Sequence, residues 1–347
     1  ALRLQASRFF ETYSFSFSEP WLGGEQPVRF STSISQTTQY RYNYMTGLAD
    51  KSQYFKIRGI NFGLAKRLQV PDDYFTLSQT IGYQYFDLNN YYTGLFTFGD
   101  GVSNNLFYAI ALSRNNTYTN PIFPTGGSTF TIGAKLTFPY SLVNNIDYGN
   151  LKNLAAYQDA SGNPDQAKID QERFKWLEYY KLNFEGTWYT RIIDKLILRT
   201  HAEFGFLGAY NAERGNIPFE RYFLGGDGLQ QYAMDGRETI ALRGYENQSL
   251  SSRDGSTVYN KFSLELRYPI TLKPSASIYA LSFLEAGNGY DNFREFNPFN
   301  SKRTARLGIR ILIPAFWPLG TDFCYRFYSV VLHELKPDAQ ENQSIIV

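Results

Sequence analysis

The sequence predicts an all-β fold, a transmembrane antiparallel β-barrel, and three observations support this prediction. Apolar and polar residues alternate with a period of two along most of the chain, which is typical of strands with one apolar and one polar face. The connections between these segments are alternately short and long, as in outer-membrane barrels. Aromatic residues are abundant, with 28 tyrosines and 29 phenylalanines, and they gather at the ends of the segments as an interfacial girdle would.

The first six strands of this barrel are expected in the N-terminal third of the chain. The clearest alternation lies in 12–18, where Tyr13, Phe15 and Phe17 alternate with serines. Such a segment places its aromatic side chains on one face of a sheet and its hydroxyls on the other. The six predicted strands are 2–8, 11–19, 27–36, 53–66, 74–86 and 105–113.

Eight further strands are expected in the rest of the chain. In 261–270, Phe262, Leu264, Leu266 and Tyr268 alternate with charged residues and serine. These strands are predicted at 128–138, 177–190, 195–206, 257–270, 276–286, 303–313, 320–328 and 341–347. The total of about fourteen strands includes several near the ~9–11 residues that a tilted membrane strand needs. A helical turn or two is expected only at 165–176, inside a loop.

The connections sort by length, which favours a barrel over a soluble sandwich. Short connections carry proline, glycine and aspartate, the residues of tight turns. The long ones, expected on the extracellular side, are 37–52, 87–104, 139–176, 207–256, 287–302 and 329–340. A sandwich also alternates, but its strands are usually shorter, ~5–6 residues, and its loops are not sorted in this way. Residues 1–347 are therefore interpreted as one barrel domain with a lipid-facing apolar band and a wet lumen.

Composition excludes several classes of function. The 34 basic and 32 acidic side chains leave a net charge of +2, which gives no support to a nucleic-acid-binding protein. No apolar run reaches the ~18–20 residues of a membrane-spanning helix. One cysteine and two histidines give no basis for an internal disulfide, a cysteine-based zinc site or a histidine-rich metal site. We therefore expect no cofactor and no metal.

Several motifs occur in a fixed order along the chain. They are SFSEPW at 16–21, FPTGG at 123–127, FERYFLGG at 219–226, LRGY at 242–245, FSLELRYP at 262–269, FLEAG at 283–287 and PLG at 318–320. In this order the chain resembles the carboxy-terminal barrel of the BamA family of outer-membrane protein assembly factors. LRGY resembles the V-R-G-F motif of that family's sixth extracellular loop. The match covers nearly the whole chain, and the motifs together are specific although each alone is weak.

The resemblance implies a sixteen-stranded barrel of which this chain carries the third to the last strand, without the first two strands or the periplasmic POTRA domains. It implies a non-enzymatic assembly factor of the bacterial outer membrane, which inserts other barrels through a lateral seam between its first and last strands. The implied partners are unfolded outer-membrane proteins, accessory lipoproteins of the assembly machinery and outer-membrane lipids. The seam strand of this chain would include Gln343, Ser344, Ile345 and Ile346, although the family usually ends in an aromatic residue and this chain ends in valine.

The candidate site residues are those of the loop motif, Leu242, Arg243, Gly244 and Tyr245. The resemblance implies that the loop folds inward and that Arg243 meets acidic residues of the inner wall, here Glu265 and Glu285. A guanidinium offers two parallel donors to a carboxylate, so such a pair would anchor the loop rather than perform covalent chemistry. Without the resemblance, a solvated loop arginine is the simpler interpretation.

Three other functions stay open at this point. A passive porin or transporter would use the same polar lumen and long loops. A related translocator of one dedicated substrate would share the motifs. An outer-membrane enzyme would need a nucleophile with a histidine and an acid. Arg199, His201 and Glu203 share the polar face of one strand, but no nucleophile accompanies them, so we interpret them as lumen lining and predict no catalytic residue.

Overall fold

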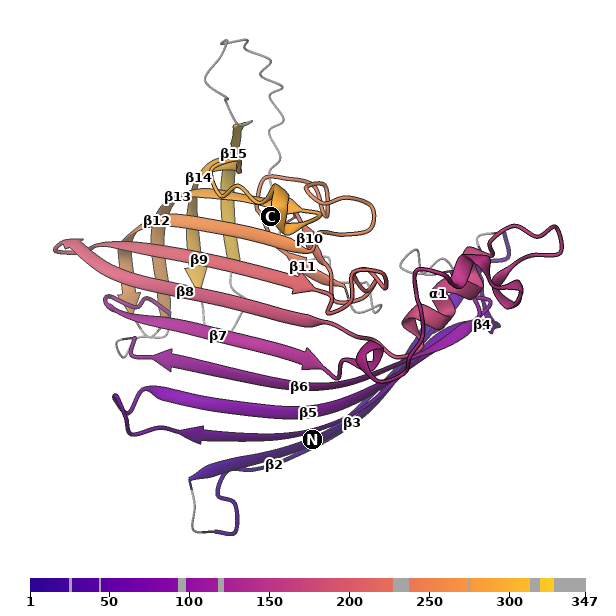
Figure 1. The fold of residues 1–347 in the computed structure, drawn as a ribbon. Helices are drawn as coiled ribbons and strands as arrows, with labels where there is room; N and C mark the ends of the chain where they lie inside the picture. The colour runs from indigo at the N-terminus through magenta and orange to yellow at the C-terminus, as the bar shows by residue number, and fades with distance from the viewer. Residues whose placement is uncertain are drawn as a thin grey trace.

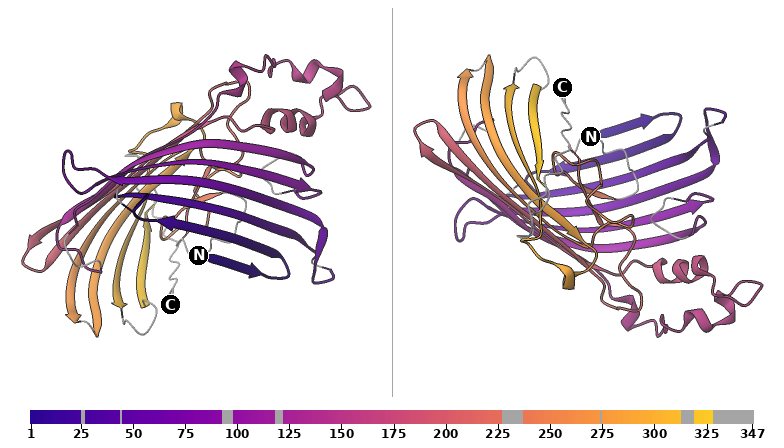
Figure 2. Two further views of the ribbon diagram at one scale, coloured as in Figure 1. Left: turned by 90° about the horizontal axis from the view of Figure 1, so that it is seen from below. Right: turned by 90° about the horizontal axis from the view of Figure 1, so that it is seen from above.

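In the computed structural model, one long antiparallel sheet makes up most of the protein. The structure describes residues 1–24, 27–43, 45–92, 98–117, 122–226, 237–273, 275–312 and 319–327. Within these ranges thirteen strands pair in chain order, from β1 to β9 and then from β12 to β15. The sheet curves round so that its concave side faces itself, as in a barrel wall (Figures 1 and 2).

The strands agree closely with the predicted alternating segments. In the first half they are β1 (Leu2–Ala6), β2 (Phe10–Glu19), β3 (Val28–Asn43), β4 (Leu48–Arg67), β5 (Phe75–Asn89), β6 (Gly101–Asn115) and β7 (Gly127–Thr137). In the second half they are β8 (Tyr180–Ile193), β9 (Leu196–Gly208), β12 (Val258–Lys273), β13 (Ala276–Tyr290), β14 (Lys302–Leu312) and β15 (Leu319–Phe327). The all-β prediction is confirmed; the strand predicted at 341–347 lies outside the described residues.

The apolar faces of the strands point outward, away from the concave side. Phe15, Leu136 and Leu264 would be buried together in a sandwich, but all three are exposed, Leu264 to 46%. Their strand neighbours on the opposite face line the concave side; Glu265 and Ser263, for example, are buried there. Exposed apolar side chains in period-two rows form the lipid-contacting band of a barrel.

Some predicted loops are shorter than expected because strands extend into them. β3 continues to Asn43 and β4 begins at Leu48, so most of the predicted loop 37–52 is a paired hairpin. The predicted loop 87–104 loses residues at both ends to β5 and β6. In residues 37–43 only Tyr40 and Tyr42 alternate with polar residues, and no aliphatic side chain is present, so this short pattern did not extend the predicted strand although the backbone pairs.

The long loops contain the remaining elements. Between β7 and β8 lie the short 3₁₀ turns η1 (Tyr140–Leu142), η2 (Leu151–Asn153) and η3 (Ala155–Tyr157), followed by α1 (Gln166–Phe174), which confirms the helical segment expected there. Asp165 caps α1 by accepting from the N–H groups of Ala167 and Lys168. A further turn, η4 (Phe293–Glu295), lies between β13 and β14. None of the described helices is long and apolar enough to span a membrane.

One long loop carries two short strands that the sequence did not predict. β10 (Tyr222–Leu224) and β11 (Glu238–Ile240) pair in parallel and form a separate small sheet. Their segment, residues 209–257 between β9 and β12, is called the inward loop below. Its described residues, 209–226 and 237–257, lie on the concave side of the large sheet (Figure 2).

Candidate functional site

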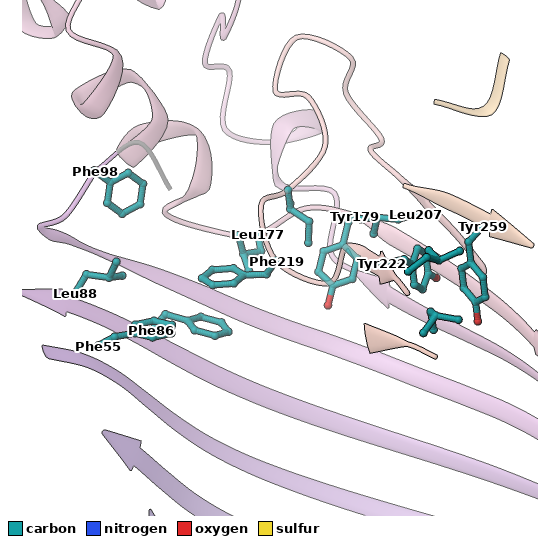
Figure 3. Packing of buried hydrophobic residues seen from close by; sticks show 13 residues of the cluster. Phe55, Phe86, Leu88, Phe98, Leu177, Tyr179, Leu207, Phe219, Tyr222 and Tyr259 are labelled. Carbon is teal, nitrogen blue, oxygen red and sulfur yellow. The ribbon is translucent and has the colours of Figure 1, made fainter. Parts of the chain in front are cut away.

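The inward loop is the candidate site, and an aromatic contact is its first attachment to the wall. Phe219 stacks on Phe86 of β5 with ring centroids 4.3 Å apart, and on Phe55 of β4 at 6.3 Å. These rings belong to the main buried apolar cluster, which joins the loop to the ends of the strands (Figure 3). Aromatic residues dominate buried contacts because each removes a large apolar area from water.

Two lysines of the wall form the second attachment. Lys135 of β7 and Lys181 of β8 are register partners, and both point to the concave side. Each binds the carboxylate of Glu220, and Lys181 also binds Glu238 of β11. Burial alone would raise the pKa of the Glu220 carboxyl, but the two ammonium groups outweigh it and hold the pKa at about 2. Glu220 is therefore a stably ionised contact of the loop.

Arg243 provides the third attachment, at the far end of the loop. Its Nε and Nη2 donate to Oε1 of Glu285 on β13 at 3.0 and 2.6 Å, and its backbone N–H donates to Oε2 at 3.1 Å. The guanidinium carbon lies 3.7 Å from the ring centroid of Phe283, so the cation also covers an aromatic face. The Glu285 side chain is only 3% exposed, which makes this a buried ion pair on the carboxylate side.

The other residues of the loop motif have separate structural roles. Leu242 is fully buried, and the hydroxyl of Tyr245 donates to the carbonyl of Arg303 on β14 at 3.1 Å. Gly244 has φ 99°, a conformation that residues with a Cβ rarely adopt. The motif is thus a turn that presents Arg243 to the wall between two anchoring side chains.

Glu265 is not a partner of Arg243, which corrects the sequence-based expectation. It receives Nε of Arg267 at 2.8 Å and lies 3.6 Å from Nη1 of Arg199. The register explains the difference, because Glu285 faces Ser263 while Glu265 faces Phe283. Glu265 therefore lies two residues further from the loop end of β12, beyond the reach of the turn at Arg243.

The polar cluster on β9 is more closely connected than its sequence suggested. The ring of His201 contacts Thr187 Oγ1 through Nδ1 at 2.7 Å and Glu203 Oε1 through Nε2 at 2.5 Å. Lys261 of β12 donates to the same Glu203 oxygen at 3.1 Å. Thr187 of β8 is the register partner of His201, and Lys261 of β12 is the register partner of Glu203. Because these partners lie on other strands, the pattern of β9 alone could not reveal them.

The predicted seam residues cannot be compared with the structure, whereas four charged residues that attach the loop were not predicted. Residues 343–346, the predicted seam, lie outside the described residues. No individual role was predicted from the sequence for Lys135, Lys181, Glu220 or Glu238. Two like charges in cross-strand register need an anionic partner, so the lysine pair was a usable signal once β7 and β8 are paired.

A second buried ion pair joins two loops outside the barrel wall. Nη1 of Arg214 donates to Glu178 at 2.6 Å, and both side chains are at most 4% exposed. Glu178 also accepts from the backbone and hydroxyl of Ser141 at 2.7 and 2.6 Å. This pair ties the inward loop to the segment between β7 and β8. The contacts of Phe219, Glu220, Arg243 and Arg214 thus position the inward loop against the wall and the neighbouring segment.

Comparison with known proteins gives the family of the chain. The Omp85 superfamily domain model matches residues 1–342. No curated protein sequence matches the chain. Among solved structures, BamA from Haemophilus ducreyi lacking POTRA domains 1–3 is similar, with 17% identity and a TM-score of 0.64 over 95% of this chain. CdiB from Escherichia coli aligns with 13% identity and a TM-score of 0.49 over 97% of this chain.

The chain spans 61% of the BamA structure and 52% of the CdiB structure. At these identities the likeness to BamA concerns the fold, which agrees with the curved antiparallel sheet and its outward apolar rows. The family match covers nearly the whole described sheet together with the inward loop. A β-barrel of this family resides in the bacterial outer membrane, and the chain belongs to the Omp85 superfamily.

Proposed function

We propose that this chain is the barrel of an assembly factor that folds other β-barrel proteins and inserts them into the outer membrane. Proteins of the superfamily handle client proteins in that membrane and are generally non-enzymatic transporters or insertases. The observation that carries the proposal is the inward loop, held by Arg243 on the buried carboxylate of Glu285. The ordered motifs that resemble the BamA family support the same role.

Insertion has a specific physical requirement. Backbone N–H and C=O groups of a client strand must be paired before they meet hydrocarbon, because lipid offers no hydrogen bonds. A barrel that opens at a seam can lend the edge of one strand to a client strand by β-augmentation. We propose that the seam strand includes Gln343, Ser344, Ile345 and Ile346. In this mechanism the clients are unfolded outer-membrane proteins, and the surrounding lipids and accessory lipoproteins are further partners.

The inward loop suits such a seam because it braces the wall from inside. Its contacts reach β4 and β5 through Phe219, β7 and β8 through Glu220, and β13 through Arg243. Strands far apart in the sheet are thereby held in position while an edge elsewhere exchanges partners. A passive pore would need the concave side of the sheet to be open for solutes, whereas here buried side chains of the loop pack against the wall.

Reconstitution of the full-length protein in liposomes tests the proposal. Unfolded outer-membrane β-barrel clients are added, and their insertion is followed by heat-modifiable gel mobility and protease protection. We expect insertion well above that of empty liposomes and a several-fold loss in Arg243→Ala. Arg253→Ala is the matched control, because Arg253 is an exposed arginine of the same loop. Insertion equal to that of empty liposomes, with steady ion conductance, would instead identify a passive pore.

A further inference from the structure

Three metal-ligating side chains gather on the concave face of β8 and β9, apart from the attachments of the inward loop. Glu185 lies directly across from Glu203, and His201 precedes Glu203 by two residues on the same face. One ligand atom from each of the three lies within 4.8 Å of the other two. Because the three positions belong to two paired strands, their spacing is set by the sheet rather than by a flexible loop.

The neighbours of these side chains orient them as the surroundings of a metal site do. Thr187 binds Nδ1 of His201 and leaves Nε2 directed at the carboxylates. Metal-bound histidines are usually held in this way by a hydrogen bond at the other ring nitrogen. Lys261 binds the Glu203 oxygen that faces the imidazole and so fixes that carboxylate as well.

Two polar groups at the cluster are left without partners. Among the described residues, the Glu185 carboxylate has no hydrogen bond or ion pair, although it faces the like charge of Glu203. Ser263, the register partner of His201 on β12, is 2% exposed, and its hydroxyl lacks a hydrogen-bond partner. Buried hydroxyls are normally paired, and opposed carboxylates are unfavourable without a cation between them.

We propose that Glu185, His201 and Glu203 bind a divalent transition-metal ion in the lumen. One imidazole nitrogen and two carboxylate oxygens suit Zn²⁺ and similar ions, and three protein ligands leave a position for water. Glu185 is exposed to the lumen, which provides an entry path for the ion. The site carries two carboxylates against the single ammonium of Lys261, so a dication reduces the local charge imbalance.

Binding requires a small rearrangement that the surroundings permit. His201 Nε2 and Glu203 Oε1 are 2.5 Å apart, whereas ligand atoms around a tetrahedral ion with bonds of ~2.0–2.1 Å lie roughly 3.3 Å apart. The imidazole must carry its proton on Nδ1 when Nε2 binds the metal. Thr187 tolerates both tautomers, because its hydroxyl can either donate to Nδ1 or accept from it.

The test uses the full-length protein without a histidine tag, in a Cys324→Ser background that removes the one cysteine of residues 1–347. The protein is stripped with a chelator, and Zn²⁺ is titrated by calorimetry and counted by elemental analysis. Co²⁺ serves as a second probe, because its visible absorption reports nitrogen and oxygen ligands. His201→Asn and Glu185→Gln are compared with His333→Asn, which removes the other histidine of the chain.

We expect one Zn²⁺ per chain in the parent and in His333→Asn, and at least a tenfold weaker affinity in His201→Asn and Glu185→Gln. The Co²⁺ band should disappear in the same two variants. Heat-modifiable gel mobility confirms that each variant is folded, and Thr187→Val, which keeps all three ligands, should weaken binding to a smaller degree. The absence of stoichiometric binding in the parent would overturn the proposal, as would equal affinity in the parent and His201→Asn.

Discussion

Arg243→Ala should release one end of the inward loop from the barrel wall. The substitution removes both guanidinium hydrogen bonds to Glu285 and the contact with the Phe283 ring. Of the three hydrogen bonds from Arg243 to Glu285, only the one from the backbone N–H of residue 243 then remains. The Glu285 carboxylate that accepts it is only 3% exposed. The cost is therefore dominated by a buried charge that has lost its counterion.

The structure sets the size of this effect. Removing one partner of a buried ion pair costs about 3–5 kcal/mol. The lower end applies here, because the Arg243 side chain is 25% exposed and water can enter after its removal. About 3 kcal/mol corresponds to a roughly 100-fold increase in the detached population of the loop, at ~1.4 kcal/mol per factor of ten.

Substitution of the partner, Glu285→Gln, should cost less free energy than Arg243→Ala. This difference between the two variants is a sharper test than the size of either effect. Glu285→Gln keeps a hydrogen-bond acceptor in the wall and leaves a guanidinium that can turn toward water. We expect about 1–1.5 kcal/mol, the range of an ordinary lost hydrogen bond. Arg253→Ala, in an exposed part of the same loop, should leave the detached population unchanged.

Hydrogen–deuterium exchange of the protein in lipid nanodiscs measures these populations. Amides of residues 238–245 report attachment, since they lie in β11 and the turn that carries Arg243. Protection there should fall about 100-fold in Arg243→Ala and about tenfold in Glu285→Gln, while strand amides of β12 keep their protection. Equal protection in all variants, or a greater loss in Glu285→Gln than in Arg243→Ala, would refute the buried-charge explanation.

Three further predictions concern other parts of the molecule. The pKa of Glu220 falls from 4.5 to about 2 in the folded protein, so its contribution is complete above about pH 4.5 and is lost as the pH falls toward 2. Pepsin should therefore cleave the inward loop increasingly as the pH falls over that interval. Glu220→Gln should abolish this part of the pH dependence, and the same pH profile in the parent and in Glu220→Gln would contradict the assigned role of Glu220. Arg214→Ala leaves the buried Glu178 carboxylate without its cation and should loosen residues 139–178 by about 3 kcal/mol, seen as faster proteolysis there; retained resistance would rule out the assigned role. Ile81→Arg, on the outward face, should lower barrel stability by about 2–4 kcal/mol, whereas Thr80→Arg, on the lumen face, should have little effect; equal urea unfolding midpoints would argue against the lipid-facing assignment.

The strands were predictable because their information is local. In β12, the alternation of Phe262, Leu264 and Leu266 with charged residues reports two faces in different solvents, whatever the partner strand is. The helix at α1 and the short turns were likewise visible in nearby residues. The alternation was too weak to use at residues 37–43, where only Tyr40 and Tyr42 alternate with polar residues and no aliphatic side chain is present.

Contacts between distant segments were less accessible. The sequence identified Arg243 and an acidic wall, and the pairing with Glu285 rather than Glu265 depended on how far the turn reaches along β13. The attachment of Glu220 to Lys135 and Lys181 joins residues 85 and 39 positions apart, so no local pattern contains it. The cluster around His201 likewise needs the register of β8, β9 and β12.

By itself, then, the sequence determined the strands, their two faces and the barrel class, because side-chain alternation is imposed residue by residue by lipid on one side and water on the other. Only the tertiary structure decided which wall charges meet the inward loop and which ligand groups converge on β8 and β9. Those choices depend on strand register and on where residues 209–226 and 237–257 of the inward loop meet the wall, and a shift of two residues along a strand is enough to exchange one carboxylate for another.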